Sequence, residues 1–311
     1  MLPEFDLMMP ETLGEALRLL AEGGPDVMAL AGGTNLIPDM RGGSCRPRML
    51  INIAGVDELR GIRLEDECLV VGGGATIAEM LDSPLIAQHA PLLREACTSM
   101  ANPLVRNRAT LGGNLTNASP AADTAPPLLA LDAEVELVSV QGSRHVRLQD
   151  FFLGPSMTVR QPNELLRSVR CPLKPPSANR YSIPPRRDWA YRKLALRKAS
   201  AVSVVSAAVS VTCDGDQHCL EARIALGAVA STPIRAYAAE AALRGDALTP
   251  ATIARAAELA AETTRCIDDI RGGAAYRKRV TGVLVRRLLT EAASAGSQEV
   301  RYSIPPLRGK R

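Results

Sequence analysis

The chain has 311 residues, 46% of them hydrophobic and 23% charged, which is long enough for about two domains with full cores. It carries 37 basic and 33 acidic residues, a net charge of +4, and only 3% of its residues are aromatic. A charge balance so close to neutral, with few aromatic side chains, argues against a dedicated nucleic-acid-binding protein.

The sequence also argues against a membrane or secreted protein. The longest apolar run, 201–211, is interrupted by serines, whereas a membrane span needs ~20 unbroken apolar residues. The N-terminus has acidic residues where a signal peptide would have a basic segment. The seven cysteines are scattered and form no CxxC pair, and the spacing of Cys213 and Cys219 around His218 is unlike that of a standard metal site. We therefore expect a cytoplasmic protein with neither a disulfide framework nor a metal centre.

The first half of the chain alternates short helices and short strands. Thr76 is expected to be a helix N-cap, because Glu79 follows at the spacing of a capping box. Pro91 suits the first turn of another helix. The three glycines at 72–74 are typical of a tight turn between a strand and a helix. Apolar spacing predicts helices over 11–22, 76–81 and 91–99, and strands over 28–30, 49–53 and 68–74.

Residues 101–133 are dense in Gly, Asn, Thr, Ser and Pro at their centre, which predicts a loop there, with a helix at 126–131. Strands are then expected over 133–140, 144–148 and 164–171. Five prolines between Pro172 and Pro185 indicate a domain boundary. Beyond them we expect strands over 191–198, 201–211 and 219–230. Three helices should follow, the first beginning at Thr232, the second beginning at Thr249 and the third spanning 273–295.

These patterns predict two domains of mixed helix and strand. The expected divisions are a domain at 1–175 with subdomains of about 1–55 and 56–175, a proline-rich linker at 176–190, a second domain at 191–295 and a mobile tail at 296–311. The hexapeptide RYSIPP occurs at both 180–185 and 301–306 and is too short to be a structural repeat. A local duplication and a shared docking peptide both explain it.

The first candidate binding segment, AGGTNL at 31–36, directly follows an apolar strand. Gly32 and Gly33 lack Cβ atoms, so backbone N–H groups can turn towards a ligand, and Thr34 and Asn35 add side-chain donors. Such a turn suits a pyrophosphate, although a tight turn without a ligand has the same pattern. It matches neither the dinucleotide fingerprint GxGxxG nor the phosphate-binding loop GxxxxGK[ST].

A second segment of the same kind, TLGGNLTNASPAAD, spans 110–123. Gly112 and Gly113 are expected to expose further backbone donors, and Asp123 supplies a carboxylate of the kind that accepts from ribose hydroxyls. Neutral hydrogen-bonding groups, which suit a flavin ring, come from Thr110, Asn114, Asn117 and Ser119. The pair of loops could hold one extended dinucleotide from two sides, although two ordinary turns remain the alternative.

The third cluster is the strand at 191–198, with the sequence YRKLALRK. Alternation places Arg192 and Leu194 on one face and Lys193 and Arg197 on the other. A cation here could stabilise a reduced, anionic flavin. A charged sheet edge that discourages strand pairing is the alternative.

Three segments together resemble the FAD-binding medium subunit of molybdenum hydroxylases, a group that includes the bacterial carbon monoxide dehydrogenase, xanthine dehydrogenase and hydroxybenzoyl-CoA reductase families. They are AGGTNLIPDM, VRNRATLGGNLTNASPAADTAPPLLALDA and YRKLALRKASAVSVVSAAV, within a match from about Phe5 to Ala295. The resemblance implies an α+β protein. It would have a two-subdomain FAD-binding domain of the vanillyl-alcohol-oxidase (PCMH) type and a smaller C-terminal α+β domain with a three-stranded sheet and helices.

The resemblance also implies positions for the cofactor. The segment from Ala31 to Asn35 would line the pyrophosphate, and Thr110 and Gly113 would continue that contact. Asp123 takes the place of an acidic residue at the cofactor. Met100 falls where some members have an aromatic side chain, which puts an NAD site in doubt. The full implied set is Leu30, Ala31, Gly32, Gly33, Thr34, Asn35, Leu36, Met100, Ala101, Thr110, Gly113, Asn114, Asn117, Asp123, Leu166 and Lys193.

The implied activity is electron relay within a complex. A large subunit with a molybdenum cofactor would hydroxylate the substrate, and a small subunit with two [2Fe–2S] clusters would carry electrons to FAD on this chain. FAD would pass them to NAD, oxygen or another acceptor. The family suggests a dimer of heterotrimers, (αβγ)2. Two alternatives are a stand-alone FAD oxidase or dehydrogenase of the same superfold and a flavin-free assembly or scaffolding subunit.

Overall fold

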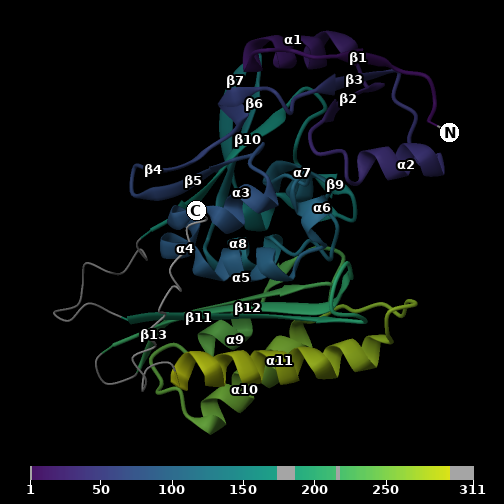
Figure 1. Ribbon diagram of the computed structural model, residues 1–311. Coiled ribbons are helices and arrows are strands. Elements are labelled where there is room, and N and C mark those ends of the chain that lie inside the picture. Colours follow the sequence, from purple (N-terminus) through teal and green to yellow (C-terminus); the bar gives the residue numbers. More distant parts are fainter. Residues whose placement is uncertain (1, 174–185, 215–217, 295–311) are drawn as a thin grey trace, which may run out of the picture.

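The computed structural model describes residues 2–173, 186–214 and 218–294, which form three stacked layers (Figure 1). The first layer is a small parallel sheet of order β1-β3-β2 with two helices beside it. Thr12 caps the first helix by accepting a hydrogen bond from the Glu15 N–H, as expected for a helix at 11–22. The elements are β1 (Asp6–Met8), α1 (Leu13–Gly23), β2 (Val27–Leu30), α2 (Leu36–Gly42) and β3 (Met49–Asn52).

The middle layer is a five-stranded antiparallel sheet of order β4-β5-β10-β6-β7, covered by six short helices. Its strands are β4 (Ile62–Glu65), β5 (Cys68–Gly72), β6 (Glu134–Ser139), β7 (Gly142–Arg147) and β10 (Leu165–Pro172), and a small hairpin of β8 (Phe152–Gly154) and β9 (Met157–Thr158) lies beside it. Its helices are α3 (Ile77–Asp82), α4 (Pro84–His89), α5 (Pro91–Ser99), α6 (Pro103–Arg106), α7 (Leu111–Thr116) and α8 (Ala125–Ala130).

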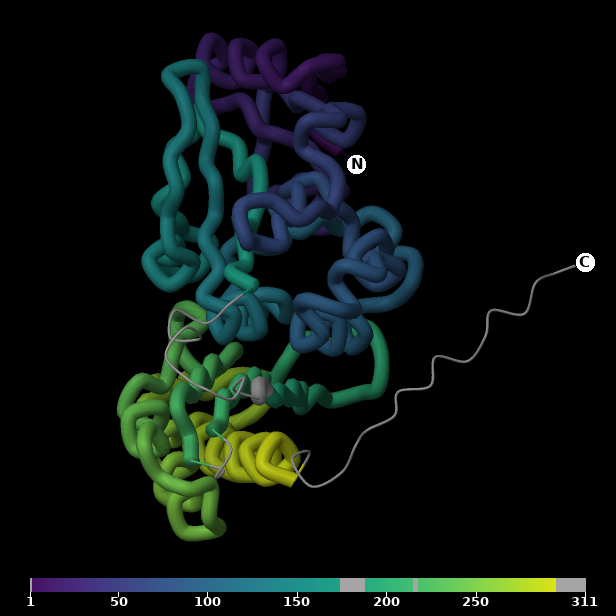
Figure 2. The backbone as a smooth tube through the Cα atoms, turned by 90° about the vertical axis from the view of Figure 1, so that its left-hand side faces the viewer, coloured from purple at the N-terminus to yellow at the C-terminus, as the bar shows by residue number. Residues whose placement is uncertain are grey.

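The third layer, formed by the C-terminal part of the chain, is a sheet packed between helices. It lies at the opposite end of the molecule from the first layer (Figure 2). Helices α5 and α8 cover one face of the sheet, while the helices of the layer itself cover the other (Figure 1). The elements are β11 (Arg186–Ala195), β12 (Ser203–Cys213), β13 (Cys219–Gly227), β14 (Ile234–Arg235), α9 (Tyr237–Ala241), α10 (Pro250–Thr263) and α11 (Ala274–Ser294). Because both faces are covered, every residue of β12 is buried.

The C-terminal sheet has four strands, so the expectation of three was wrong. The fourth is β14, which pairs with the edge of β13 at Ala225 and Leu226. This pairing replaces the first turn of the helix expected at Thr232, and α9 begins only at Tyr237. The outer edge of β13 offers backbone groups that a short strand satisfies, whereas an isolated helical turn would leave that edge open.

Strand β11 begins at Arg186, so residues 186–190 belong to the sheet and not to the expected linker. The rest of that linker, both copies of RYSIPP and the expected tail lie outside the described residues. Two local helix signals were read correctly, unlike the one at Thr232. Thr76 and Glu79 form the predicted capping box, and α10 has Thr249 as its N-cap with proline at its first position.

Two findings concern the described residues alone. None of their helices is both long and apolar enough to cross a bilayer. Nor do three or more of their His, Cys, Asp or Glu side chains gather in a way that could hold a metal ion.

Candidate functional site

The first glycine segment forms the turn between β2 and α2. Leu30 ends the strand and Leu36 begins the helix. Gly33 has φ +71°, a conformation that L side chains rarely adopt. A Cβ atom on Gly32 would lie 1.9 Å from the carbonyl oxygen of Arg108. This turn therefore rests directly on the backbone that leads into the second glycine segment.

The turn presents a row of unused backbone donors. Within the described parts of the chain, the N–H groups of residues 32–35 donate to no protein acceptor. The carbonyls of Gly33 and Asn35 point the other way and accept from Ile37 and Asp39 of α2. Successive N–H groups that point away from the protein at the start of a helix attract an anion. The segment thus retains the donors that a pyrophosphate requires.

The second glycine segment is helical at its centre, which corrects the loop expected within 101–133. Thr110 caps α7 by accepting from the N–H of Gly113 at 3.1 Å. The N–H of Gly112 donates to the carbonyl of Gly73 at 2.8 Å. Both glycine N–H groups are therefore used inside the protein, and the expectation that they are exposed donors was wrong. Gly113 itself is exposed, and a Cβ there would meet only the Thr110 Oγ1.

The glycines at 72–74 have a function in packing that the sequence reading missed. A Cβ on Gly73 would lie 2.1 Å from the carbonyl oxygen of Leu166, and one on Gly112 would lie 2.7 Å from the Gly73 carbonyl oxygen. These positions let the backbones of β5, β10 and α7 approach one another without side chains between them. Three consecutive glycines after a strand were the available signal for such a close approach.

Asn114 and Asn117 follow on the same helix. Asn114 Oδ1 accepts from the Thr124 hydroxyl at 2.6 Å, which ties α7 to the start of α8. Asn117 is the C-cap residue of α7 and its N–H donates to the Gly113 carbonyl. Both side chains are half-buried.

Asp123 joins the middle layer to the C-terminal sheet. One of its oxygens lies 2.6 Å from the Lys193 Nζ on β11, and the other accepts from the Ser203 hydroxyl on β12 at 2.7 Å. The side chains of Asp123 and Lys193 are only 10% and 6% exposed. Both carboxylate oxygens are therefore engaged within the protein, so the expected acceptance from ribose hydroxyls is not supported. Ser203 was missed because its contact depends on how two distant segments dock.

Met100, Ala101 and Leu166 lie close to these groups. Met100 and Leu166 are buried within the main hydrophobic core, 8% and 6% exposed. Ala101 has φ +47°, and its carbonyl accepts from the N–H of Ser200 in the loop between β11 and β12. The β11–β12 hairpin thus contacts the middle layer beside the Asp123–Lys193 ion pair.

Burial controls the titration of two groups near this pair. It raises the pKa of Tyr191 well above its usual value, and the Asp123 charge adds to the shift. It also raises the pKa of the Cys97 thiol to about 12, again with a contribution from Asp123. Both groups are therefore protonated, and so uncharged, at neutral pH.

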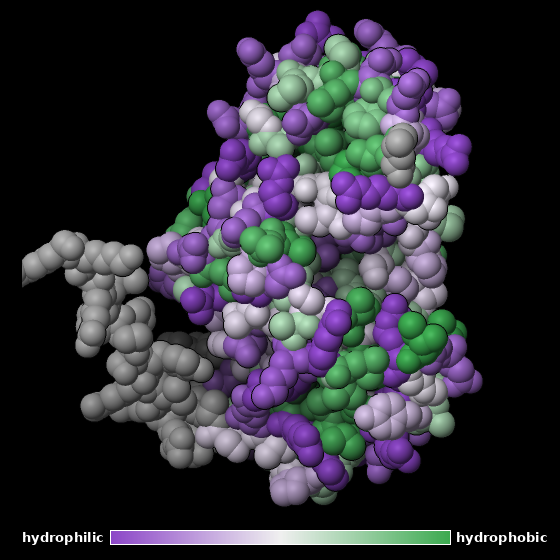
Figure 3. Space-filling view, turned by 45° about the vertical axis from the view of Figure 1, so that its right-hand side comes forward, coloured by the Kyte–Doolittle hydropathy of each residue, from purple (hydrophilic) through white to green (hydrophobic). Residues whose placement is uncertain are grey.

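A cavity of about 370 Å³ opens beside Lys193 and is lined mainly by the β11–β12 hairpin and Ser99. Exposed apolar side chains lie on the nearby segments: Leu104 is 81% and Leu196 is 70% exposed. Ile270, in the loop before α11, is 97% exposed. Figure 3 shows hydrophobic patches among polar residues over both ends of this side of the molecule. Such patches are typical of surfaces that contact another protein.

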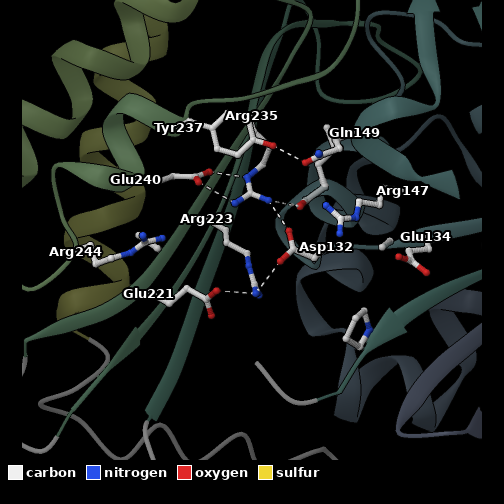
Figure 4. A pocket seen from close by; sticks show the side chains of 14 residues that line it. Asp132, Glu134, Arg147, Gln149, Glu221, Arg223, Arg235, Tyr237, Glu240 and Arg244 are labelled. Atoms are coloured by element: carbon white, nitrogen blue, oxygen red, sulfur yellow. Dashed lines mark hydrogen bonds and ion pairs between the residues drawn. The ribbon is translucent and has the colours of Figure 1, made fainter. Parts of the chain in front are cut away.

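A second cavity, of about 470 Å³, lies between the middle layer and the C-terminal layer. Asp132 reaches it from the middle layer and contacts Arg223 at 2.7 Å and Arg235 at 2.5 Å (Figure 4). Arg235 also binds both oxygens of Glu240, at 2.6 and 2.8 Å. Burial opposes the charge of Arg235, but hydrogen bonds and charge from Glu240, with Asp132, raise its pKa above the ordinary value. These ion pairs connect the middle layer to the C-terminal layer.

We expect Asp132→Asn to lower the free energy of unfolding by about 1–2 kcal/mol, since it weakens two charge-assisted contacts at a position that is partly exposed. Asp132 has φ +51°, which asparagine tolerates. Asp66→Asn is the matched control, because Asp66 has φ +49° and a longer, 3.3 Å contact with Arg170 at the surface. Thermal unfolding should separate the two variants. Equal melting temperatures would contradict a stabilising effect of the Asp132 ion pairs.

Comparison with known proteins agrees with this geometry. Residues 3–174 match the family model described as the FAD binding domain in molybdopterin dehydrogenase, and residues 189–292 match the CO dehydrogenase flavoprotein C-terminal domain. The carbon monoxide dehydrogenase medium chain of Hydrogenophaga pseudoflava is 34% identical over 290 residues, which cover 93% of this chain and 97% of that one. A putative xanthine dehydrogenase FAD-binding subunit of Escherichia coli is 31% identical, with coverage of 91% and 94%.

Solved structures are similar over almost the whole length. Reconstituted CO dehydrogenase from Oligotropha carboxidovorans has a chain with a TM-score of 0.88 and 34% identity, covering 94% of this chain and 99% of that one. Quinoline 2-oxidoreductase from Pseudomonas putida has one with a TM-score of 0.87 and 30% identity, covering 96% of this chain and all of that one. These matches and the two glycine segments lead to one conclusion: the chain belongs to the family of FAD-binding subunits of molybdenum hydroxylases.

Proposed function

We propose that this chain is the electron-transfer subunit of a molybdenum hydroxylase complex, receiving electrons from [2Fe–2S] clusters on a small subunit. A large subunit with a molybdenum cofactor would carry out the hydroxylation. FAD held by this chain would supply a group that is stable after gaining one or two electrons, and NAD, oxygen or another acceptor would take them up. The observation that carries the proposal is the row of unused N–H donors at 32–35, in contact with the second glycine segment.

We assign the residues of this chain to two parts of the cofactor. The turn at 31–35 would hold the pyrophosphate through its backbone N–H groups. The exposed face of α7 at Gly113, with Asn114 and Asn117, would continue the contact with the cofactor. Lys193, held by Asp123, would place a cation beside the flavin, where it favours the negative charge gained on reduction. The cofactor would thus contact residues of both the middle layer and the C-terminal sheet.

We also propose the arrangement around this chain. Residues 2–173 would be an FAD-binding unit of the vanillyl-alcohol-oxidase type, and 186–294 a unit that completes the site with Lys193. Exposed apolar residues beside the β11–β12 hairpin support a subunit that works in contact with partners. The relatives named above are called a medium chain and an FAD-binding subunit, which supports a complex of several subunits. We propose a dimer of heterotrimers as its arrangement.

The visible absorption spectrum of the purified chain, with chromatography of the released cofactor, tests the assignment. We expect the two visible bands of an oxidised flavin and one FAD per chain. Coexpression with neighbouring genes should recover one larger and one smaller partner. A chain that releases no FAD on denaturation after incubation with the cofactor, both alone and with its partners, would contradict the proposal.

We expect Gly113→Val to reduce FAD occupancy to below about a tenth of the wild-type value. The valine side chain would fill the open face of α7 and block close approach of the cofactor to the backbone. Only the Thr110 hydroxyl lies near the new Cβ, so the fold should persist, which circular dichroism can verify. Gly14→Val is the control, because Gly14 lies on α1 with no atom near its Cβ. Equal FAD occupancy in both variants would remove Gly113 from the site.

A further inference from the structure

Two cysteines face each other at the end of the central hairpin of the C-terminal sheet. Cys213 ends β12, Cys219 begins β13, and the strand register pairs them directly. A bulge immediately before this pair sets the register. Thr212 pairs with Glu221 and Cys213 with Cys219, so one extra residue of β13, Leu220, lies between the two pairings.

The hydrogen-bond pattern defines what kind of pair this is. The Cys219 N–H donates to the Asp246 carbonyl, and the Cys219 carbonyl accepts from the Gly245 N–H. Both backbone groups of Cys219 therefore point away from Cys213. At the next pair of residues, the Asp214 N–H donates to the His218 carbonyl. This is a non-hydrogen-bonded antiparallel pair, in which Cα atoms lie about 4.5 Å apart. Disulfides span Cα separations of about 4.4–6.8 Å.

The two side chains also lie on the same face of the sheet. Both belong to the hydrophobic cluster beneath α10 and α11, with Cys213 6% and Cys219 0% exposed. Burial raises the pKa of Cys219 to about 12, and the charge of Cys213 adds to the shift, as expected for neighbouring sulfur atoms. Cys219 is therefore protonated at neutral pH, and the more exposed Cys213 is the thiol that a peroxide would reach first.

We propose that Cys213 and Cys219 are an oxidisable pair that forms an intrachain disulfide when the protein meets a peroxide. The more exposed Cys213 would attack the O–O bond, giving a sulfenic acid and releasing one water molecule. The Cys219 thiol would then displace the second water and form the S–S bond. In total, two thiols lose two electrons and two protons, and one peroxide becomes two water molecules. The bond would close the β12–β13 hairpin at the end of β12 opposite Ser203.

Peptide mapping of the full-length chain after treatment with hydrogen peroxide tests this directly. Trypsin should release residues 199–223, which contain only these two of the seven cysteines. We expect this peptide to be lighter by two hydrogen atoms in most of the protein, and the thiol count of the denatured chain to fall from seven to five. Dithiothreitol should restore both values.

Single variants assign the bond. Cys213→Ser and Cys219→Ser should each abolish the loss of two hydrogens, whereas Cys266→Ser, at a half-buried cysteine outside the pair, should leave it unchanged. A peptide that stays fully reduced, or that gains oxygen without forming the cross-link, would overturn the proposal. The wild-type peptide decides the matter even if a serine variant does not fold.

Discussion

Replacing Gly32 with alanine should abolish FAD binding, because the new Cβ would lie 1.9 Å from the carbonyl oxygen of Arg108. Real Cβ atoms essentially never approach another atom closer than 3.0 Å, and here the obstacle is backbone, which no side-chain rotation can move. The turn must therefore separate from the second glycine segment by more than 1 Å. A shift of that size disperses the N–H donors of 32–35, whose joint direction is what an anion requires.

The measurement is the amount of FAD released per chain after denaturation, together with the Kd for added FAD. We expect at least a hundredfold rise in Kd, because several hydrogen bonds to one charged group are lost together, at about 1.5–3 kcal/mol each. Gly14→Ala is the matched control. Its Cβ meets no atom, and alanine within α1 should raise stability by up to about 1 kcal/mol. If Gly32→Ala bound FAD as tightly as the control, the turn would not be the pyrophosphate site.

The contact between Gly32 and Arg108 also shows where sequence reasoning succeeds and where it stops. The turn at 31–36 and the helix caps at Thr76 and Thr249 are local features, decided by residues within four positions, and they were predicted. The helix α7 was missed because its composition resembles a loop. Its Gly112 lies against the backbone of Gly73, and its cap is Thr110. Composition alone does not distinguish a glycine needed for a turn from one needed for close contact between two backbones.

Contacts between distant segments could not be derived from the sequence at all. Lys193 and Asp123 were both proposed as site residues, but that they bind each other, and that Ser203 completes the group, depends on the docking of two layers. The fourth strand, β14, has the same origin, since it forms on an edge that only the folded sheet provides. Fold class and cofactor were implied by the family resemblance that the motifs carry, whereas the electrostatics of the site required the tertiary structure.

Asp123→Ala is expected to cause the largest loss of stability. The Lys193 side chain is 6% exposed and its Nζ lies 2.6 Å from Asp123, so removal of the carboxylate leaves a buried charge without its partner. Such a change costs about 3–5 kcal/mol. It should lower the melting temperature by about 6–15 °C. Ser203→Ala, which removes only the second hydrogen bond of Asp123, should cost about 1–2 kcal/mol.

The double variant Asp123→Leu/Lys193→Met distinguishes the loss of stability caused by an unpaired charge from the loss caused by a missing contact. If the penalty comes from the isolated cation, the double variant should recover most of the stability that Asp123→Ala loses, since two apolar side chains need no counter-charge. It should nonetheless bind FAD more weakly, because the cation beside the flavin is gone. Recovery of stability without recovery of FAD affinity would show that the pair is kept for the cofactor and not for the fold. A double variant as unstable as Asp123→Ala would show instead that packing of these two side chains matters more than their charges.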